Sequence, residues 1–159
     1  MIVPLTQGRY AEIDDLDAQL ANSHKWHAIY IKSNQSNRWY AGTWVDDKRV
    51  YLHRYLMEPE KGQQVDHKNG NGLDCRRGNM RLCTNQQNSW NARKHGCKCH
   101  SDLKGVTYMK SGKRRKRWIA QIYADGVHRN LGYFLTEQEA HEAYKEAAIK
   151  HFGEFARWV

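Results

Sequence analysis

The sequence predicts an α+β protein made of two small modules. The first contains a strand, a long loop, a returning strand and a helix within about residues 57–95. The second is a three-stranded antiparallel sheet followed by one helix over residues 104–159. Three observations predict this class: apolar and polar residues alternate with the period of a strand, Asn-Gly and Asp-Gly pairs mark tight turns, and two capping-box patterns mark helix starts.

The composition favours a polyanionic partner. Lys and Arg outnumber Asp and Glu by 26 to 17, which gives a net charge of +9 and an isoelectric point near 9.5. Nucleic acid is the first candidate and an anionic membrane surface the second. No apolar run reaches the roughly 18 residues of a membrane span, and residues 1–5 do not resemble the core of a signal peptide. We therefore expect a soluble, cytoplasmic protein whose cysteines are thiols or metal ligands, not disulfides.

Residues 1–56 are predicted to form a β-rich lead-in. Short strands are expected over residues 26–31, 38–45 and 49–52. Residues 13–20 fit one short helix with acidic residues near its start, where the helix dipole favours negative charge. Arg54, near the end of the lead-in, is a candidate phosphate contact, and a plain surface charge on a short helix is the equal alternative.

The polar residues after the lead-in form the most informative pattern in the chain. Residues 64–67 fit a strand, two Asn-Gly turn signals follow, and residues 80–83 fit the returning strand. Thr84, with Gln87 three residues on, fits the N-cap of a helix over about residues 85–93.

This order places Asp66, His67 and Asn88 within reach of one another. If the helix packs across the hairpin, Asp66 and Asn88 can converge on one cation, while His67 points past it towards a substrate. Mg²⁺ suits such a site because it needs few protein oxygens and can stabilise charge on a phosphate. Histidine, whose pKa is ordinarily about 6.5, can take a proton from an attacking water. A partly buried histidine without chemistry is the alternative for His67 taken alone.

The spacing of these residues resembles the HNH nucleases. The residues that carry the resemblance are His53-Arg54, residues 65–70, Leu73-Asp74, residues 79–81, Asn88 and Asn91. The most similar group is the homing endonucleases of phages and introns, in which the first motif residue is Asp instead of His. The resemblance covers about residues 1–95.

The resemblance implies a role for each matching residue. Asp66 and Asn88 would hold one divalent ion, Mg²⁺ or Mn²⁺, and His67 would be the general base. Asn79 would hydrogen-bond across the loop and fix the backbone and ring of His67. Structural support is implied for Asp74 and Asn91. The family fold is the ββα-metal finger, and its products carry 5′-phosphate and 3′-hydroxyl ends.

The cysteines do not have the spacing that is typical of structural zinc. They are Cys75, Cys83, Cys97 and Cys99. Structural zinc commonly uses paired Cys-x-x-Cys segments, whereas one pair here is wider and the other tighter. Because some HNH proteins carry a zinc knuckle, a zinc site stays an alternative. Cys83 is expected to be a small core residue.

The second module follows a polar, basic linker over residues 96–103. Strands are expected over residues 105–110, 118–124 and 127–134. Asp125-Gly126 is a hairpin turn signal. Thr136 starts a helix with an alanine-rich stripe, which lets it lie close to the sheet, and Gly153 fits its C-cap.

This module resembles the DNA-binding domain of the plant APETALA/ethylene-response-factor type, which is also found in phage HNH endonucleases. The matching residues are Gly105-Val106, residues 118–122, residues 131–134, Glu139-Ala140, Ala143-Tyr144, Ala147-Ala148 and Phe152-Gly153. In that family the sheet lies in the major groove of DNA. The chain departs from the plant pattern, which has Arg, Arg, Glu and Arg at the positions of Thr107, Met109, Gln121 and Tyr123. The plant base code is therefore not expected to apply.

Basic residues of the second module are the expected DNA contacts. They are Lys110, Lys113, Arg114, Arg115, Lys116, Arg117 and Arg129. Most should contact phosphates and make binding salt-dependent. A solvated charged turn is the alternative for residues 113–117, and Trp118 is either a core residue or a DNA contact.

Together these patterns predict a site-specific, metal-dependent DNA endonuclease of the homing type, encoded by a phage or intron and acting on duplex DNA in the host cell. It would act as a monomer or homodimer. One HNH centre cuts one strand, so a monomer should nick. The alternatives are a DNA-binding regulator with a degenerate nuclease module and a restriction-type or RNA-directed HNH nuclease.

Overall fold

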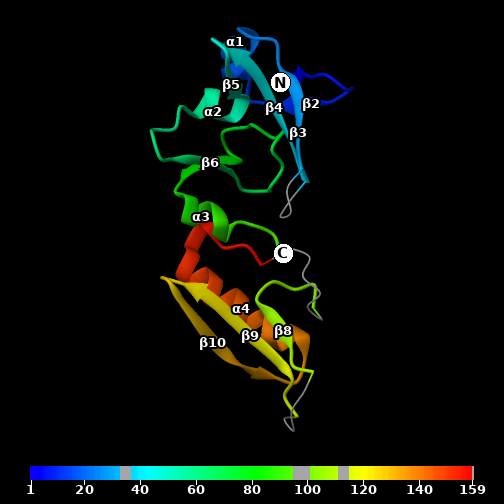
Figure 1. Ribbon diagram of the computed structural model, residues 1–159, viewed down its shortest axis with the longest axis vertical. Coiled ribbons are helices and arrows are strands. Elements are labelled where there is room, and N and C mark those ends of the chain that lie inside the picture. Colours follow the sequence, from blue (N-terminus) through cyan, green and yellow to red (C-terminus); the bar gives the residue numbers. More distant parts are fainter. Residues whose placement is uncertain (33–36, 95–100, 111–114, 159) are drawn as a thin grey trace. The chain divides into compact units, whose positions relative to one another are not determined.

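The structure, a computed structural model, describes residues 1–32, 37–94, 101–110 and 115–158 (Figure 1). It has a few helices and several small antiparallel sheets. The predicted α+β class is confirmed. Contacts divide the chain into two units, Met1–Ser89 and Trp90–Val159. The functional module boundaries at residues 95 and 104 remain predictions.

The N-terminal unit begins with four short elements and a three-stranded sheet. The short elements are β1 (Ile2–Pro4), β2 (Tyr10–Glu12), the 3-10 helix η1 (Asp15–Asp17) and α1 (Ala18–Asn22). The sheet has the order β3 (His27–Lys32), β4 (Asn37–Val45) and β5 (Lys48–Tyr51), with antiparallel pairing throughout. Helix α2 (Leu52–Met57) begins directly after β5. The buried core of this unit includes Ile13, Leu52 and Cys75.

A hairpin and a helix complete the unit. Strands β6 (Gln64–His67) and β7 (Met80–Cys83) pair antiparallel, and α3 (Asn85–Trp90) follows. The Thr84 hydroxyl accepts from the Gln87 amide at 3.2 Å, and Gln87 Oε1 accepts from the Thr84 amide at 2.8 Å. This reciprocal pair confirms the predicted capping box. The helix ends at Trp90, before the predicted end at residue 93.

Residues 13–20 do not form the single helix that the sequence predicted. Ile13 lies in the core, and the helical residues divide into η1 and α1. Asp17 is 0% exposed. Arg77 donates to it from Nε at 3.0 Å and from Nη2 at 2.7 Å. A buried carboxylate needs such a partner, and the long-range ion pair with Arg77 supplies it.

Arg77→Met will lower the free energy of unfolding of the N-terminal unit by about 3 kcal/mol, because it leaves the Asp17 carboxylate buried without its counter-ion. Amide hydrogen exchange in this unit measures the change. Lys48→Met removes an exposed cation from β5 and should change the stability little. A loss no larger for Arg77→Met than for Lys48→Met would show that the ion pair contributes nothing.

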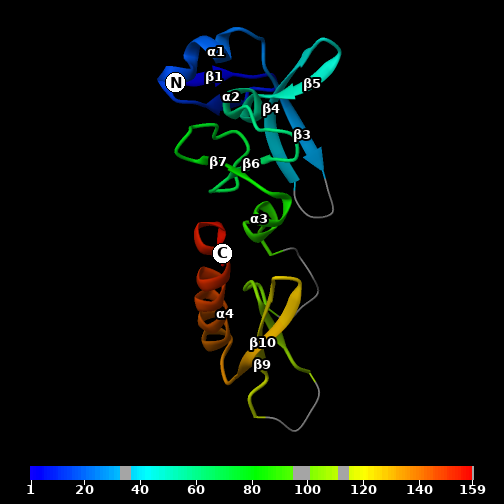
Figure 2. The same cartoon turned by 90° about the vertical axis from the view of Figure 1, so that its left-hand side faces the viewer.

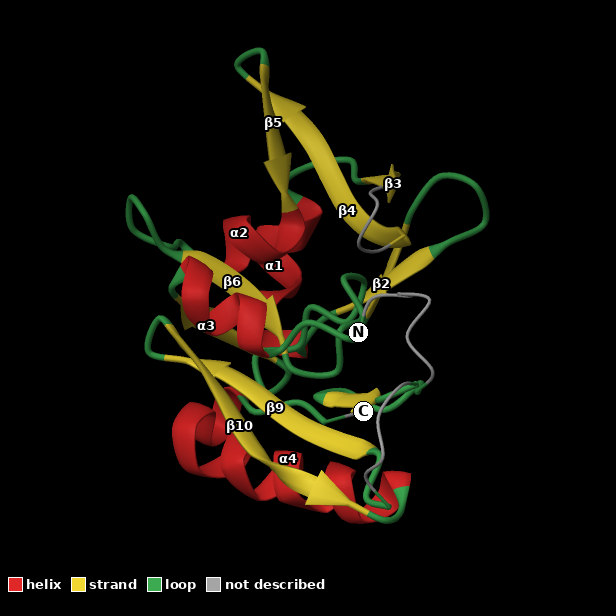
Figure 3. Ribbon diagram, turned by 60° about the horizontal axis from the view of Figure 1, so that its bottom comes forward, coloured by secondary structure: helices red, strands yellow, loops and turns green. Residues whose placement is uncertain are grey.

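The C-terminal unit is a three-stranded antiparallel sheet with a helix on one face. The spatial order is β10 (Val127–Phe134), β9 (Trp118–Ala124) and β8 (Val106–Tyr108). Helix α4 (Glu137–Phe152) runs along the sheet (Figures 2 and 3). It starts at the capping box of Thr136 and Glu139 and is followed by the 3-10 helix η2 (Gly153–Phe155). Among the described residues, no helix is long and apolar enough to cross a membrane.

Small side chains bring α4 close to the sheet. Ala140 and Ala148 are 0% exposed and belong to the two clusters that pack α4 on β9. At Gly105, just before β8, φ is +75°, and an added Cβ would overlap the ring of Tyr144. Glycine is required there by both the backbone conformation and the close approach.

Candidate active site

Asp66 and His67 occupy the last two positions of β6, and the strand pairing determines their neighbours. The register places Asp66 opposite Arg81 and His67 opposite Met80. Arg81 donates to Oδ2 of Asp66 from Nε at 2.9 Å and from Nη2 at 2.7 Å. The two side chains are only 10% and 4% exposed. Arg81 therefore neutralises the carboxylate that was expected to bind a metal.

Asn79 holds together the loop that joins β6 to β7. Its Oδ1 accepts from the Asn69 amide at 3.1 Å, its Nδ2 donates to the Asp74 carbonyl at 2.7 Å, and its carbonyl accepts from the Lys68 amide at 2.9 Å. The Asn79 side chain thus contacts the backbone shortly after His67.

Asp74 closes the same loop from the other side. Its carboxylate accepts from Asn69 Nδ2 at 2.8 Å and from Arg76 Nε and Nη2 at 2.7 Å each. The hydrogen bonds from Arg76 hold the pKa of Asp74 below its usual value, so the group is an ionised structural anchor.

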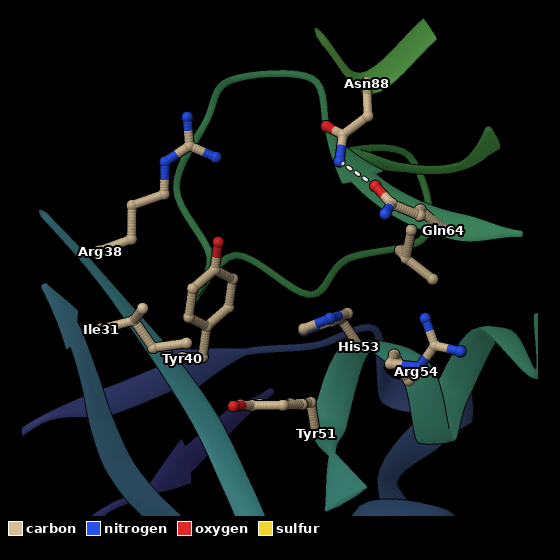
Figure 4. A pocket seen from close by; sticks show the side chains of 9 residues that line it. Ile31, Arg38, Tyr40, Tyr51, His53, Arg54, Gln64 and Asn88 are labelled. Carbon is tan, nitrogen blue, oxygen red and sulfur yellow. Dashed lines mark hydrogen bonds between the residues drawn. The ribbon is translucent and has the colours of Figure 1, made fainter. Parts of the chain in front are cut away.

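A pocket of about 270 Å³ opens between the sheet, α2, β6 and α3 (Figure 4). It is lined by Ile31, Arg38, Tyr40, Tyr51, His53, Arg54, Gln64, Val65 and Asn88. Asn88 Nδ2 donates to Gln64 Oε1 at 2.5 Å, and Figure 4 shows the Asn88 amide oxygen turned away from Gln64. Asp66 and His67 are not among the lining residues.

His53 connects the pocket with His67. The His53 ring meets the His67 ring edge-on at a centroid distance of 5.1 Å, and it stacks on Tyr51 at 5.6 Å with an interplanar angle of 21°. The sequence pattern included His53 but assigned it no role. The only sequence signal for a role of His53 was its position beside Arg54. The contact between His53 and His67 could not be predicted, because it depends on how α2 packs on the hairpin.

Both histidines are neutral at pH 7. Desolvation by burial lowers the pKa of His67 to about 4, although the carboxylates of Asp66 and Asp74 raise it in part. Desolvation by burial, with smaller contributions from the neighbouring His67 and Arg54, lowers the pKa of His53 to about 3. The ordinary histidine pKa that the sequence suggested therefore does not hold, but a neutral His67 is the form that accepts a proton.

The expected DNA contacts fall into four groups, of which Arg129 is described separately below. Arg54 lines the pocket, and its Nη1 donates to the Gln63 carbonyl at 3.4 Å. Four basic residues are exposed in the C-terminal unit, near the end of β8 and the start of β9: Lys110, Arg115, Lys116 and Arg117. Lys113 and Arg114 lie outside the described residues.

Arg129 has a different environment from the other basic candidates. It pairs in register with Ile122, which belongs to the cluster packed against α4. Its Nη1 donates to the Ala124 carbonyl at 2.8 Å, and its Nη2 lies 3.4 Å from Asp125. The alternation of the strands instead exposes Gln121, Tyr123, His128 and Asn130, which the sequence did not identify as contacts.

The described cysteines are buried thiols. Burial raises the pKa of Cys75, in the core, to about 12. Cys83 Sγ donates to the Gln64 carbonyl at 3.6 Å. Within the described ranges, no three His, Cys, Asp or Glu side chains are grouped to hold a metal. Cys97 and Cys99 lie outside those ranges.

Comparison with known proteins identifies the segment that contains this site. The HNH endonuclease family profile matches residues 50–90, which hold α2, β6, β7 and α3. Protein 3.8 of Escherichia phage T7 is 34% identical over 98 residues, with 62% of this chain and 77% of that protein covered. The chain belongs to the HNH endonuclease family. An uncharacterised HNH endonuclease of Acanthamoeba polyphaga mimivirus is 28% identical over 130 residues, with 75% of this chain covered.

The chain spans 65% of the length of that mimivirus protein, which is less than two thirds. No solved structure matches the chain closely enough to count as a relative. The HNH match contains the site residues His53, Asp66, His67, Asn79 and Asn88.

Proposed function

We propose that the protein is a site-specific, divalent-metal-dependent DNA endonuclease of the homing type. The observation that carries this proposal is the contact of neutral His67 with His53, which lines a pocket. That pocket is also lined by Asn88 and by two arginines, Arg38 and Arg54. A proton acceptor, hard oxygen donors and fixed positive charge are the groups that phosphodiester hydrolysis requires.

Asp66 and Asn88 would hold a single Mg²⁺ or Mn²⁺ ion. A carboxylate and an amide oxygen are hard donors, which these ions prefer. The Asn88 amide nitrogen is engaged by Gln64, and its oxygen points away from Gln64, which suits a ligand position (Figure 4). When bound, the ion supplies positive charge to the scissile phosphate and the leaving oxygen.

The chain's own residues would supply proton transfer, neutralisation of the phosphate charge and positioning of the loop. His67 takes a proton from the water whose oxygen attacks phosphorus, and the bond from phosphorus to the 3′ oxygen breaks. The products are a 5′-phosphate and, once the 3′ oxygen gains a proton from solvent, a 3′-hydroxyl. Arg38 and Arg54 offset the charge of the phosphate, and Asn79 fixes the loop after His67.

The C-terminal unit is proposed to grip duplex DNA, as its resemblance to APETALA-type domains implies. Support comes from its exposed basic residues and from the sheet face opposite α4, where the hydrogen-bonding side chains are Gln121, Tyr123, His128 and Asn130. A small sheet fits the major groove, and phosphate contacts would make the affinity fall steeply with salt. A monomer would nick the DNA, and a homodimer would cut both strands.

A DNA-binding regulator with an inactive nuclease module is the second candidate. It is favoured by one observation, which is that Arg81 already neutralises Asp66. Such a protein would bind DNA with a steep salt dependence and would cut none.

Digestion of a randomised plasmid library with purified protein and Mg²⁺, followed by strand-by-strand sequencing of the ends, tests the proposal. We expect breaks at one consensus sequence. A parallel digest at raised salt should lose cleavage as DNA binding weakens. DNA that is bound but stays intact with both Mg²⁺ and Mn²⁺ would support the regulator and rule out the nuclease.

A further inference from the structure

His53 is a buried imidazole without a hydrogen-bond partner in the described part of the chain. The side chain is only 8% exposed, and its Nδ1 is shut off from solvent and unpartnered. Leaving a buried polar group without a partner lowers the stability of the folded state. Such groups are rare in native proteins and call for a specific explanation, for example a catalytic role of the ring that carries them.

Aromatic packing holds the His53 ring firmly in place. It stacks on Tyr51, meets His67 edge-on, and lies 5.4 Å from the Tyr40 ring between centroids. These contacts explain why a flat ring occupies the position. They do not explain why the ring carries nitrogens, because a phenylalanine would pack in the same way without the loss of hydration.

The position of His53 on the pocket wall allows a ring nitrogen to contact a bound substrate. His53 lines the pocket together with Arg54 and Asn88 (Figure 4). Because Nδ1 is closed off, Nε2 is the nitrogen available to the pocket. Phosphate oxygens are acceptors, so a neutral imidazole would meet one as a donor, with its proton on Nε2. In that tautomer the buried Nδ1 is only a bare acceptor.

We propose that His53 is a further catalytic residue, whose Nε2–H donates a hydrogen bond to a non-bridging oxygen of the scissile phosphate. This role rests on the proposed function. A donor that is fixed by packing before the substrate arrives stabilises the negative charge that grows on that oxygen as the water attacks. His53 holds its proton throughout, so His67 alone accepts one.

Three substitutions separate this role from packing. His53→Phe keeps the ring and removes both nitrogens, and it should lower the single-turnover cleavage rate roughly 100-fold. His53→Gln places an amide donor close to the position of Nε2 and should recover a large part of that loss. His53→Asn places its amide near Nδ1, out of reach, and should be as slow as His53→Phe. DNA affinity in EDTA and thermal unfolding serve as controls for folding.

A purely packing role predicts the opposite order, with His53→Phe active and His53→Gln impaired, and that order would overturn the proposal. A second measurement uses duplexes with one non-bridging oxygen of the cleaved linkage replaced by sulfur, which accepts hydrogen bonds poorly. We expect the wild type to be slowed by one sulfur isomer even in Mn²⁺, and His53→Phe to lose that discrimination. Unchanged discrimination in His53→Phe would contradict the role.

The outcome for the wild type separates the two proposals. Wild-type protein that cuts no DNA overturns the proposed function and the His53 role with it. Wild-type cleavage with an equally active His53→Phe variant overturns the His53 role alone.

Discussion

His67→Ala is expected to lower the rate of DNA cleavage about 1,000-fold, because it removes the imidazole that takes the proton of the attacking water. The methyl group that replaces the ring cannot accept a proton. DNA affinity measured in EDTA should stay within a few-fold of wild type, because the proposed DNA contacts are made by the basic residues of the C-terminal unit. Single-turnover digestion of a duplex that contains the cleavage site measures the rate.

His27→Ala provides the matched control. His27 is an exposed histidine on β3 of the same unit, so its loss should leave the cleavage rate unchanged. The assignment of His67 as the base fails if His67→Ala keeps more than a tenth of the wild-type rate. Thermal unfolding of His67→Ala serves as the control that a lower rate does not come from loss of the fold.

Arg81→Met is expected to lower the free energy of unfolding of the metal-free N-terminal unit by about 4 kcal/mol, because it removes the guanidinium that offsets the charge of the buried Asp66 carboxylate. Mg²⁺ should then recover more stability in the variant than in the wild type. A cation that binds the folded state stabilises it by mass action, and in the variant it also replaces the missing positive charge. Amide hydrogen exchange in β6 and β7, with EDTA and with Mg²⁺, measures both effects.

Arg49→Met is the control for this prediction. Arg49 is an exposed cation on β5 that lies over the Trp44 ring at 5.2 Å, so the same change of charge there should cost little and should not alter the response to Mg²⁺. Equal stabilisation of wild type and Arg81→Met by Mg²⁺ would show that the metal does not bind at Asp66. That result would favour the DNA-binding regulator.

Features that depend on neighbouring residues could be predicted from the sequence. The capping boxes at Thr84 and Thr136 form because each side chain reaches an amide three residues away. The Asp125-Gly126 turn follows from two residues that tolerate positive φ, which are +55° and +76° here. The hairpin and helix around Asp66 follow from the same local chemistry.

Features that depend on distant contacts could not be predicted in this way. The ion pair of Asp17 joins residues 60 positions apart, and the pair of Asp66 depends on the exact register of β6 and β7. His53 reaches His67 only through the packing of α2. Arg129 pairs with Ile122 before the register shift between Asn130 and Gly132, so simple alternation from the turn places the two side chains on one face. Its environment was missed because the assignment rested on its charge and not on the face of the sheet.

The most direct test of the central claim is the digestion of plasmid DNA carrying the selected target site by wild-type protein, with Mg²⁺ in one reaction and EDTA in the other. The account predicts breaks at that site only with Mg²⁺, with ends that DNA ligase can rejoin because they carry 5′-phosphate and 3′-hydroxyl groups. Intact plasmid in Mg²⁺, or equal cleavage in EDTA, would contradict it.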